Sequence, residues 1–239
     1  MNIHDLAKSY KIDQAGATIV GQAKMVFMCG VTAAGKDTLV SELVKKPGYY
    51  RLVSHTTRAP RYNDGILEQD GVDYHFVSEQ QMAQLLADHK MVEVNNFGGK
   101  FYGTSLAEIT KANASVRVAI SDIDVNGFQS IYSIAPDSVI AVFVVPPDYD
   151  TWLGRLNKRY ESNQSALADA VNERVNIAMG EISHALSSKN YYFIVNDNLG
   201  KTVQKLDKII QRASRGKKVN DWRARRVANQ ILQQIKLHN

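Results

Sequence analysis

Lys36 follows the second of two glycines that stand five residues apart, in the segment Gly30-Val31-Thr32-Ala33-Ala34-Gly35-Lys36. Glycines let the backbone turn tightly, so that consecutive N–H groups can point at phosphate oxygens. The lysine adds a positive charge for the β- and γ-phosphates of a nucleoside triphosphate. A buried strand is predicted before this segment, at 25–29, and a helix after it, at 35–45, whose N-terminus also favours anions. The spacing and its context therefore predict a phosphate-binding loop.

The position after the lysine departs from the usual pattern of such loops. Asp37 stands where a Ser or Thr usually ligates magnesium, and Thr38 comes next. A carboxylate is a competent Mg²⁺ ligand, although it adds negative charge beside a triphosphate. Three arrangements follow from the residues: Asp37 binds the metal directly, binds it through water, or leaves that role to Thr38.

A second group of residues suits a phosphate monoester. Arg58 and Arg61 stand three residues apart in a charged segment, and Tyr74 lies beyond them. Guanidinium groups bind phosphate through two parallel hydrogen bonds, and a phenol adds one more. A charged segment of this kind is more often a solvated surface. The order of residue types in this one is more specific than its charge.

Alternating apolar and amphipathic segments must position these residues. Strands alternating with helices predict an α/β fold with a parallel sheet. Residues 58–73 are rich in charge, Pro and Gly and are predicted as a loop, and residues 1–23 show no strong periodicity. The predicted strands are 25–29, 52–54, 116–120, 139–145 and 191–195, and the predicted helices are 35–45, 78–89, 166–187, 199–212 and 219–236, with helical stretches after the third and fourth strands.

Composition excludes several classes of protein. The chain has 239 residues, of which 44% are hydrophobic, so it can form one large domain or one domain with additions rather than a disordered chain. The longest apolar run, 139–145, is far too short for a membrane span. No secretory signal is visible at the N-terminus, and Cys29 is the only cysteine, so we expect no disulfide and a cytoplasmic location.

The net charge of +5 is unevenly distributed. Residues 211–239 contain eight Lys or Arg and one acid, giving +7, so the other 210 residues sum to −2. The basic character therefore belongs to the C-terminal segment. Its predicted helix carries an apolar stripe, which most often packs on its own domain or on a partner subunit. A basic amphipathic helix could instead contact nucleic acid or an anionic membrane, which we favour less.

In these motifs and in those that follow along the sequence, the chain resembles the guanylate kinase family of nucleoside monophosphate kinases. The likeness covers about residues 25–212 and keeps the order of motifs. It rests on the phosphate-binding loop, Ser54-His55-Thr56-Thr57-Arg58-Ala59-Pro60-Arg61, Glu68-Gln69-Asp70-Gly71-Val72-Asp73-Tyr74-His75-Phe76, Glu93 to Thr104, Asp122-Ile123-Asp124-Val125-Asn126-Gly127, Pro146-Pro147 with Arg155-Leu156 and Arg159, and Val195-Asn196-Asp197.

The resemblance implies a P-loop kinase core with a parallel sheet flanked by helices, a small mixed α/β GMP-binding subdomain and a lid. It implies transfer of the ATP γ-phosphoryl group to GMP, and to dGMP, with Mg²⁺. The corresponding domain boundaries are an N-terminal extension at 1–24, a kinase domain at 25–212 and a basic amphipathic C-terminal helix at 213–239. Within the kinase domain, the GMP-binding segment is about 54–104 and the lid about 155–174. A homo-oligomer is also an expectation.

The resemblance also assigns roles to single residues. Ser54, Glu93, Thr104 and Asp124 would form the guanine pocket, because a carboxylate pairs with guanine N1–H and the exocyclic amine as adenine cannot. The residues implied to hold the GMP phosphate are Arg58, Arg61, Tyr74 and Tyr102, and Glu68 is implied as the acid of the GMP-binding loop. Asp122 would lie near GMP, the metal and the transferring group, and Asn196 would lie beside the ATP adenine. Lys36, Arg58, Arg155, Arg159 and Arg174 would neutralise charge during transfer.

Two segments depart from the family pattern. The stretch 62–67 lengthens the acceptor loop by about four residues, which is thermodynamically cheap in a loop. Asp64 competes there with Glu68 for the role of the loop acid, and we prefer Glu68 because it keeps the register to Tyr74. In the lid, Tyr160 stands where a Gly usually follows Arg159, and the stretch to Arg174 is also longer.

Two other functions remain as alternatives. Gly35-Lys36-Asp37 also occurs in related kinases that form ribose 1,5-bisphosphate, and guanylate-kinase-like domains of scaffold proteins bind peptides without catalysis. Glu93 and the two acceptor arginines favour a guanine nucleotide over the first alternative. The intact phosphate-binding loop argues against the second.

Overall fold

The computed structural model describes residues 2–63, 65–160 and 167–238. Its contacts divide the chain into two compact units. Unit 1 comprises residues 1–25, 47–121 and 126–139, and unit 2 comprises residues 26–46, 122–125 and 140–239. No helix among the described residues is long and apolar enough to cross a membrane.

Unit 2 contains the strands that precede the predicted ATP-side residues. β1 (Met25–Cys29), β10 (Val139–Val145) and β11 (Tyr191–Val195) are neighbours in the order β11-β10-β1, and β10 runs parallel to β11. All five residues of β1 are buried, as expected for a strand covered on both faces. The helices of this unit are α3 (Lys36–Leu43), α7 (Tyr149–Tyr160), α8 (Leu167–Ser187), α9 (Leu199–Ala213) and α10 (Trp222–His238).

Unit 1 carries the predicted GMP-side residues on a second sheet. Its strand order is β6-β3-β8-β7, in which β3 runs antiparallel to β8 and β8 antiparallel to β7. The strands are β3 (His55–Thr56), β6 (His75–Phe76), β7 (Met91–Phe97) and β8 (Lys100–Ser105), and a parallel pair is formed by β2 (Tyr49–Arg51) and β9 (Val118–Asp122). The helices are α1 (Ile3–Ser9), α2 (Gln14–Gly21), α4 (Glu79–Ala87), α5 (Leu106–Ser115), α6 (Val125–Ile134) and the 3-10 helix η1 (Pro136–Ser138).

Several predicted elements are confirmed. The strands predicted at 25–29, 139–145 and 191–195 have the observed bounds, and two parallel pairs support the predicted parallel sheet. The helix predicted at 78–89 is α4. Ser78 caps it by accepting from the N–H of Gln81, whose side chain accepts in turn from the N–H of Ser78. This reciprocal capping is what the Ser at the start of the segment predicts.

Other predictions were wrong in detail. Residues 52–54 lie between β2 and β3 rather than in a strand: the N–H of Leu52 still donates to the Ile120 carbonyl on β9, but the N–H of Val53 donates to the Glu108 carboxylate. The strand predicted at 116–120 begins at Val118, since Val116 caps α5 in a left-handed conformation. Residues 58–73 are not wholly a loop: β4 (Tyr62–Asn63) and β5 (Ile66–Leu67) form a small hairpin.

The N-terminal segment, in which no periodicity was evident, forms α1 and α2. Side chains cap both helices: Asn2 accepts from the N–H of His4, and Asp13 accepts from the N–H of Gly16. Ile3 packs with Met82, Leu86, Met91 and Phe101 in a hydrophobic cluster of unit 1. The two capping residues are the sequence feature that could have predicted these helices. Helices this short contain too few residues to show a helical period in the apolar positions.

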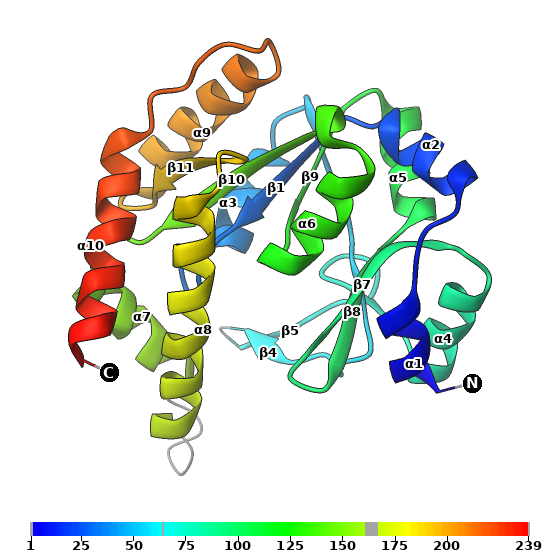
Figure 1. Cartoon of the computed structure of the whole chain (residues 1–239), viewed down its shortest axis with the longest axis horizontal. Helices are drawn as coiled ribbons and strands as arrows, with labels where there is room; N and C mark the ends of the chain where they lie inside the picture. Colours follow the sequence, from blue (N-terminus) through cyan, green and yellow to red (C-terminus); the bar gives the residue numbers. More distant parts are fainter. Residues whose placement is uncertain (1, 64, 161–166, 239) are drawn as a thin grey trace. The chain divides into compact units, whose positions relative to one another are not determined.

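The C-terminal basic segment forms α10, which lies along α8 and also contacts β11 and α7 (Figure 1). Its buried residues are Ala224, Ala228, Ile231, Leu232 and Ile235. The interpretation that the apolar stripe packs on its own chain is therefore confirmed, and the helix begins at Trp222 rather than at 219.

One ionic contact anchors the start of α10. Asp221 accepts hydrogen bonds from the N–H of Phe193 at 2.9 Å and from Arg225 Nε at 3.1 Å. Arg225 Nη2 donates to the Tyr191 carbonyl at 2.6 Å, and its guanidinium lies over the Phe193 ring. The pair thus replaces backbone partners along one edge of β11.

We predict that Arg225→Ala lowers the free energy of unfolding by about 2 kcal/mol, because it removes charge-assisted hydrogen bonds from a half-buried site. Arg226→Ala is the matched control: it removes the same charge from an exposed position one residue away. Urea unfolding measures both variants. Equal effects of the two substitutions would contradict the anchoring role.

Candidate functional site

The phosphate-binding loop in unit 2 leaves β1 through a glycine that nothing larger can replace. Gly30 has φ +134°, and a Cβ there would lie 2.3 Å from the Val144 carbonyl oxygen on β10. Gly35 ends the loop at φ +88° and serves as the N-cap of α3. Ala33 also has positive φ, +64°, which costs a residue with a Cβ strain energy. The loop is therefore a tightly constrained turn between strand and helix.

Lys36 begins α3 and turns back over the loop. Its Nζ donates to the Gly30 carbonyl at 2.6 Å and to the Val31 carbonyl at 3.1 Å. The ammonium group is thus held at the loop by backbone oxygens, on the element that the motif predicted. This position suits a cation that exchanges carbonyl partners for phosphate oxygens.

Asp37 and Thr38 lie in the first turn of α3, and both are exposed. Asp122, at the end of β9, and Asp124 follow in unit 2 and are half-buried. Carboxylate and hydroxyl oxygens are the ligands that Mg²⁺ prefers, so this donor set fits the metal. No group of three or more His, Cys, Asp or Glu arranged to hold a metal by themselves occurs among the described residues.

Asn196 supports the loop from the end of β11. It is buried, and its Nδ2 donates to the Ala34 carbonyl at 2.9 Å. A Cβ on Gly35 would lie 2.4 Å from the same nitrogen, so the glycine is needed for this contact. The place of Asn196 beside the adenine, which the resemblance implies, stays a prediction, and the structure shows that its side chain holds the loop.

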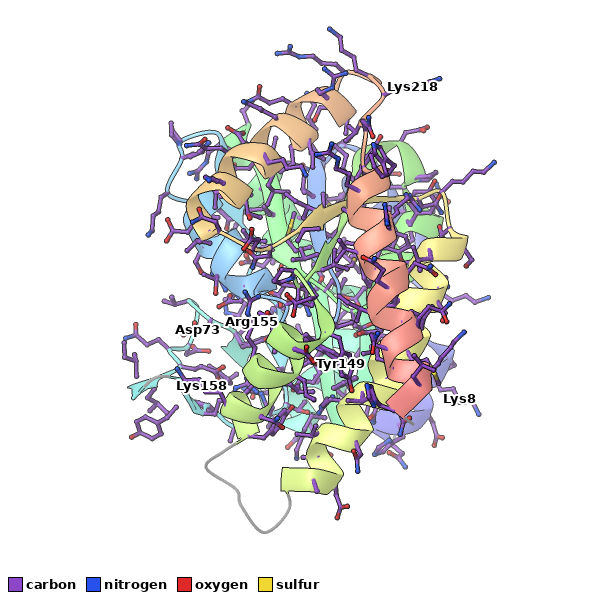
Figure 2. The ribbon with its side chains drawn as sticks, turned by 90° about the vertical axis from the view of Figure 1, so that its left-hand side faces the viewer. Lys8, Asp73, Tyr149, Arg155, Lys158 and Lys218 are labelled. Carbon is purple, nitrogen blue, oxygen red and sulfur yellow. The ribbon has the colours of Figure 1, made fainter. Side chains whose placement is uncertain are left out.

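Helix α7 contacts both this loop and the residue that supports it. The buried Trp152 donates its indole N–H to the Thr32 carbonyl at 2.8 Å, and Arg155 donates to the Asn196 carbonyl at 3.3 Å. Figure 2 shows Arg155 on this helix. Trp152 is a supporting residue that sequence reasoning missed, because its partner is a backbone carbonyl 120 residues away.

The remaining lid arginines lie on α7 and α8. Arg159 is exposed in the last turn of α7. Arg174 Nε donates to the Tyr160 hydroxyl at 3.1 Å, so the tyrosine that departs from the family pattern contacts a predicted lid arginine. Residues 161–166, between these helices, lie outside the described residues, as does Asp64.

Glu181 on α8 is a second residue that the sequence did not single out. Burial raises the pKa of its carboxyl to about 7; the charge of Lys36 opposes this shift, the charge of Asp124 adds to it, and that of Arg174 opposes it. The carboxyl therefore lies within electrostatic reach of Lys36 and Asp124, two predicted site residues. Its proton adjusts the charge near the phosphate-binding loop.

The acceptor arginines of unit 1 converge on one buried acid. Glu68 is 7% exposed and forms ion pairs with Arg58 at 2.8 Å and with Arg61 at 3.3 Å. Burial raises the pKa of Glu68, but hydrogen bonds from Arg58 and from the N–H of Arg61, together with both charges, outweigh it and lower the pKa below its usual value. The ionised Glu68 thus holds two guanidinium groups and leaves the cluster with a net positive charge.

Two tyrosines complete this acceptor cluster. The Arg58 guanidinium lies 5.3 Å from the centre of the Tyr74 ring, and the Tyr74 and Tyr102 rings meet edge to face at 6.0 Å. A hydrogen bond between Tyr102 and Arg58 also contributes to the electrostatics of the guanidinium. The structure therefore brings together Arg58, Arg61, Glu68, Tyr74 and Tyr102, as the resemblance implied.

Glu93 and Thr104 are cross-strand neighbours on β7 and β8. Glu93 is 5% exposed; its Oε1 accepts from the N–H of Thr104 at 2.8 Å, and its Oε2 accepts from Asn95 Nδ2 at 2.9 Å. A Cβ on Gly103 would lie 2.5 Å from the Glu93 carbonyl oxygen, so the glycine allows this close pairing. A buried, oriented carboxylate is a specific acceptor for an N–H edge.

Ser54 is half-buried before β3, and a buried carboxylate that sequence reasoning missed supports its segment. Glu108 is 2% exposed and accepts from the N–H of Val53 at 3.1 Å and from Lys111 at 2.7 Å. His75 Nε2 lies 3.3 Å from the same carboxylate, and the Ser54 carbonyl accepts from the N–H of His75. Burial, together with the nearby His75, lowers the pKa of His55 to about 4.

The sequence model of one family, described as guanylate kinase, matches residues 22–213. The guanylate kinase of Schizosaccharomyces pombe is 35% identical over 200 residues, covering 82% of this chain and 94% of that protein. The guanylate kinases of Sulfurimonas denitrificans and Haemophilus influenzae are 34% and 35% identical, covering 83% and 80% of this chain and 93% and 89% of those proteins.

A solved structure shows the same fold. The crystal structure of guanylate kinase from Anaplasma phagocytophilum matches with a TM-score of 0.61, over 80% of this chain and 86% of that one. Sequence identity in this match is 22%, so it is evidence for the fold. The α/β class with a parallel sheet flanked by helices is confirmed.

The raised pKa of Glu181 predicts how stability depends on pH. Between about pH 4.5 and 7 the folded state keeps a proton that the unfolded state releases, so the stability due to this group falls as pH rises, by about 3 kcal/mol in total. We therefore expect wild type to lose stability relative to Glu181→Gln as pH rises across this window, by up to about 3 kcal/mol. Urea unfolding at several pH values measures it.

The control for this prediction is Glu173→Gln, at an exposed position of the same helix. It should leave the pH dependence of unfolding unchanged. His55 contributes a slope of opposite sign in wild type and in both variants, and it cancels in the comparison. Parallel pH curves for wild type and Glu181→Gln would rule out the proposed protonation.

Proposed function

Since the chain belongs to the guanylate kinase family, we propose that it transfers the γ-phosphoryl group of ATP to GMP, giving ADP and GDP. The observation that carries the choice of acceptor is the buried Glu93 carboxylate beside Thr104. Guanine presents N1–H and an amine to such a group, whereas adenine leaves the carboxylate unpaired, which is costly in a buried site. The Arg58–Glu68–Arg61 cluster supports a phosphate monoester as the other half of this acceptor.

The phosphate-binding loop would bind the ATP phosphates. Its backbone N–H groups and the N-terminus of α3 favour anions, and Lys36 supplies a positive charge. The segment Gly30-Val31-Thr32-Ala33-Ala34-Gly35-Lys36-Asp37-Thr38 and Asn196 are the proposed ATP-binding residues. Bound Mg²⁺, held by Asp37 or Thr38, would supply charge neutralisation between the β- and γ-phosphates.

On the acceptor side, the GMP phosphate would be held by Arg58, Arg61, Tyr74 and Tyr102, with Glu68 orienting both arginines. The proposed base pocket consists of Ser54, Glu93, Thr104 and Asp124, with Asp122 near the reacting phosphates. An oxygen of the GMP phosphate attacks the γ-phosphorus in line, and the bond to the ADP oxygen breaks. Because the attacking oxygen is already anionic, no strong general base is needed.

Catalysis would then consist of positioning and charge neutralisation. In this proposal Lys36 contacts the phosphates of ATP, and Arg58 contacts the phosphate of GMP. Arg155, Arg159 and Arg174 supply further positive charge from α7 and α8. The contact of Arg155 with Asn196 supports this role, because it attaches that arginine to the residue that also holds the phosphate-binding loop.

The finer parts of the proposal concern cellular context and organisation. We propose dGMP as a second acceptor, a cytoplasmic location and a role in purine nucleotide metabolism. We also propose the domain boundaries stated above: an extension at 1–24, the kinase domain at 25–212 and the basic helical segment at 213–239. A homo-oligomer stays a prediction.

The function is tested by a coupled assay with ATP, Mg²⁺ and each of GMP, dGMP, AMP, UMP and ribose 1,5-bisphosphate. We expect turnover with GMP and dGMP. Glu93→Gln should lower kcat/KM for GMP by about 10- to 100-fold, because a neutral amide replaces a charged acceptor while still pairing with the N–H of Thr104.

The matched control is Glu79→Gln, an exposed position on α4 of the same unit, which should leave kcat/KM for GMP unchanged. Absence of GMP turnover by the folded protein would overturn the proposal. Turnover with ribose 1,5-bisphosphate alone would establish the alternative kinase activity instead.

The loop residue Asp37 yields a separate prediction. If its carboxylate holds the metal, Asp37→Ala raises the Mg²⁺ concentration needed for half-maximal activity, while Thr38→Val has little effect. The opposite ranking would assign the metal to Thr38. A Mg²⁺ titration of both variants at saturating ATP distinguishes these cases, and unchanged Mg²⁺ dependence in Asp37→Ala would exclude the carboxylate as a ligand.

A further inference from the structure

A basic groove lies in unit 2 between α9 and the start of α10. It consists of two cavities that share Lys208 and Arg212. The larger, of about 650 Å³, is lined by Lys205, Lys208, Ile209, Arg212, Lys218, Val219, Asn220, Asp221 and Trp222. The smaller, of about 260 Å³, is lined by Lys208, Gln211, Arg212, Arg215 and Lys217. The groove therefore presents six cationic side chains and one acid.

The positive charge of this groove is not neutralised locally. Among the described residues, no ion pair engages Lys205, Lys208, Arg215, Lys217 or Lys218, and all five are exposed. Figure 2 shows Lys218 at the turn between the two helices. The one acid, Asp221, is committed to Arg225 and to the N–H of Phe193. A concave surface with this balance of charge attracts a polyanion.

Trp222 adds a feature that charge alone would not. Its side chain lines the larger cavity and is 54% exposed, whereas Trp152 is fully buried. The Arg223 guanidinium lies 5.4 Å from the centre of the Trp222 ring. An exposed indole beside lysines is a surface on which a nucleobase can stack while its phosphates meet the cations.

The packing of α10 decides between nucleic acid and membrane as the polyanion. An amphipathic helix that lies in a bilayer interface inserts its apolar face into the lipid. In this protein that face is buried against α8, β11 and α7. The exposed surface offers cations and one aromatic ring in a groove, which matches a flexible strand better than a bilayer.

We propose that the basic groove binds single-stranded nucleic acid, with phosphates at the lysines and a base stacked on Trp222. Two cavities that share Lys208 and Arg212 in their linings fit a strand of several nucleotides. None of the residues that line the groove is assigned to ATP or GMP. The proposal is therefore independent of the kinase reaction.

The experiment measures binding of a fluorescein-labelled 12-nucleotide oligouridylate to the full-length protein by anisotropy at several salt concentrations. The combined variant Lys205→Gln, Lys208→Gln, Lys217→Gln and Lys218→Gln removes four groove charges. Its matched control, Lys8→Gln, Lys11→Gln, Lys24→Gln and Lys189→Gln, removes four exposed charges outside the groove. Arg212 is left intact because it donates to the Lys218 carbonyl.

We expect the groove variant to lose at least about tenfold in affinity at low salt, with the control unchanged. In wild type, a plot of the logarithm of the binding constant against the logarithm of the salt concentration should have a slope of about −0.7 for each phosphate contacted. The groove variant should show a smaller slope. Trp222→Ala should weaken binding about fivefold or more, and Trp222→Phe should retain most of it.

Tryptophan fluorescence provides an independent readout. Acrylamide reaches the exposed Trp222 and not the buried Trp152, so bound oligonucleotide should protect the emission from quenching. GMP kinase activity should be the same in all these variants, which shows that they fold.

Several results would overturn the proposal. One is equal binding of the oligonucleotide by the groove and control variants. Another is binding of GTP at the groove as tight as that of the 12-nucleotide strand, which would indicate a mononucleotide site. The third is groove-dependent binding to vesicles containing phosphatidylserine without binding to the oligonucleotide, which would assign the surface to membranes.

Discussion

The hydrogen bond from the Asn196 side chain to the Ala34 carbonyl is the contact on which the ATP side of this kinase depends. A loop whose N–H groups face phosphate leaves carbonyl oxygens that need partners inside the protein, and an unpaired buried carbonyl is costly. Asn196 supplies one partner, while its own N–H donates to Val145 and its carbonyl accepts from Arg155. One buried residue, through its side chain and its backbone, thus connects two strands, the loop and α7.

Buried carboxylates have the same role in the unit that carries the acceptor residues. The side chains of Glu68, Glu93 and Glu108 each accept a hydrogen bond from a backbone N–H of another part of the chain. The donors are Arg61, Thr104 and Val53, respectively. A charge inside a protein is tolerated only where such partners surround it. The need to pair each carboxylate therefore fixes the positions of the chain segments that present Ser54, Arg58 and Thr104.

The apolar and the basic residues of the C-terminal helix have different roles. Its apolar residues complete the packing of α8 and β11, and the Asp221–Arg225 pair sets where it begins. Its remaining cations stay outside, together with those of α9. The arginines assigned to nucleotide phosphates lie on other elements. The proposed kinase reaction therefore does not account for the positive charge of this region.

The sequence by itself determined the chemistry. The spacing of Gly30, Gly35 and Lys36 requires a tight turn before a helix, and the buried strands 139–145 and 191–195 are evident from their unbroken apolar runs. Two arginines followed by a tyrosine likewise suit a phosphate monoester, and the family resemblance implied that Arg58, Arg61, Glu68 and Tyr74 belong together. These features are local, so they are legible in a single stretch of chain.

Only the tertiary structure shows which residues hold these reactive groups in place. Trp152, Glu108 and Glu181 contact or influence site residues that are far away in the sequence, and no local pattern marks them. The start of the strand at Val118 was predicted two residues too early, and the short helices α1 and α2 were missed, because caps and long-range packing rather than periodicity set these bounds. Local patterns name the reactive groups, whereas their orientation depends on partners that only folding brings together.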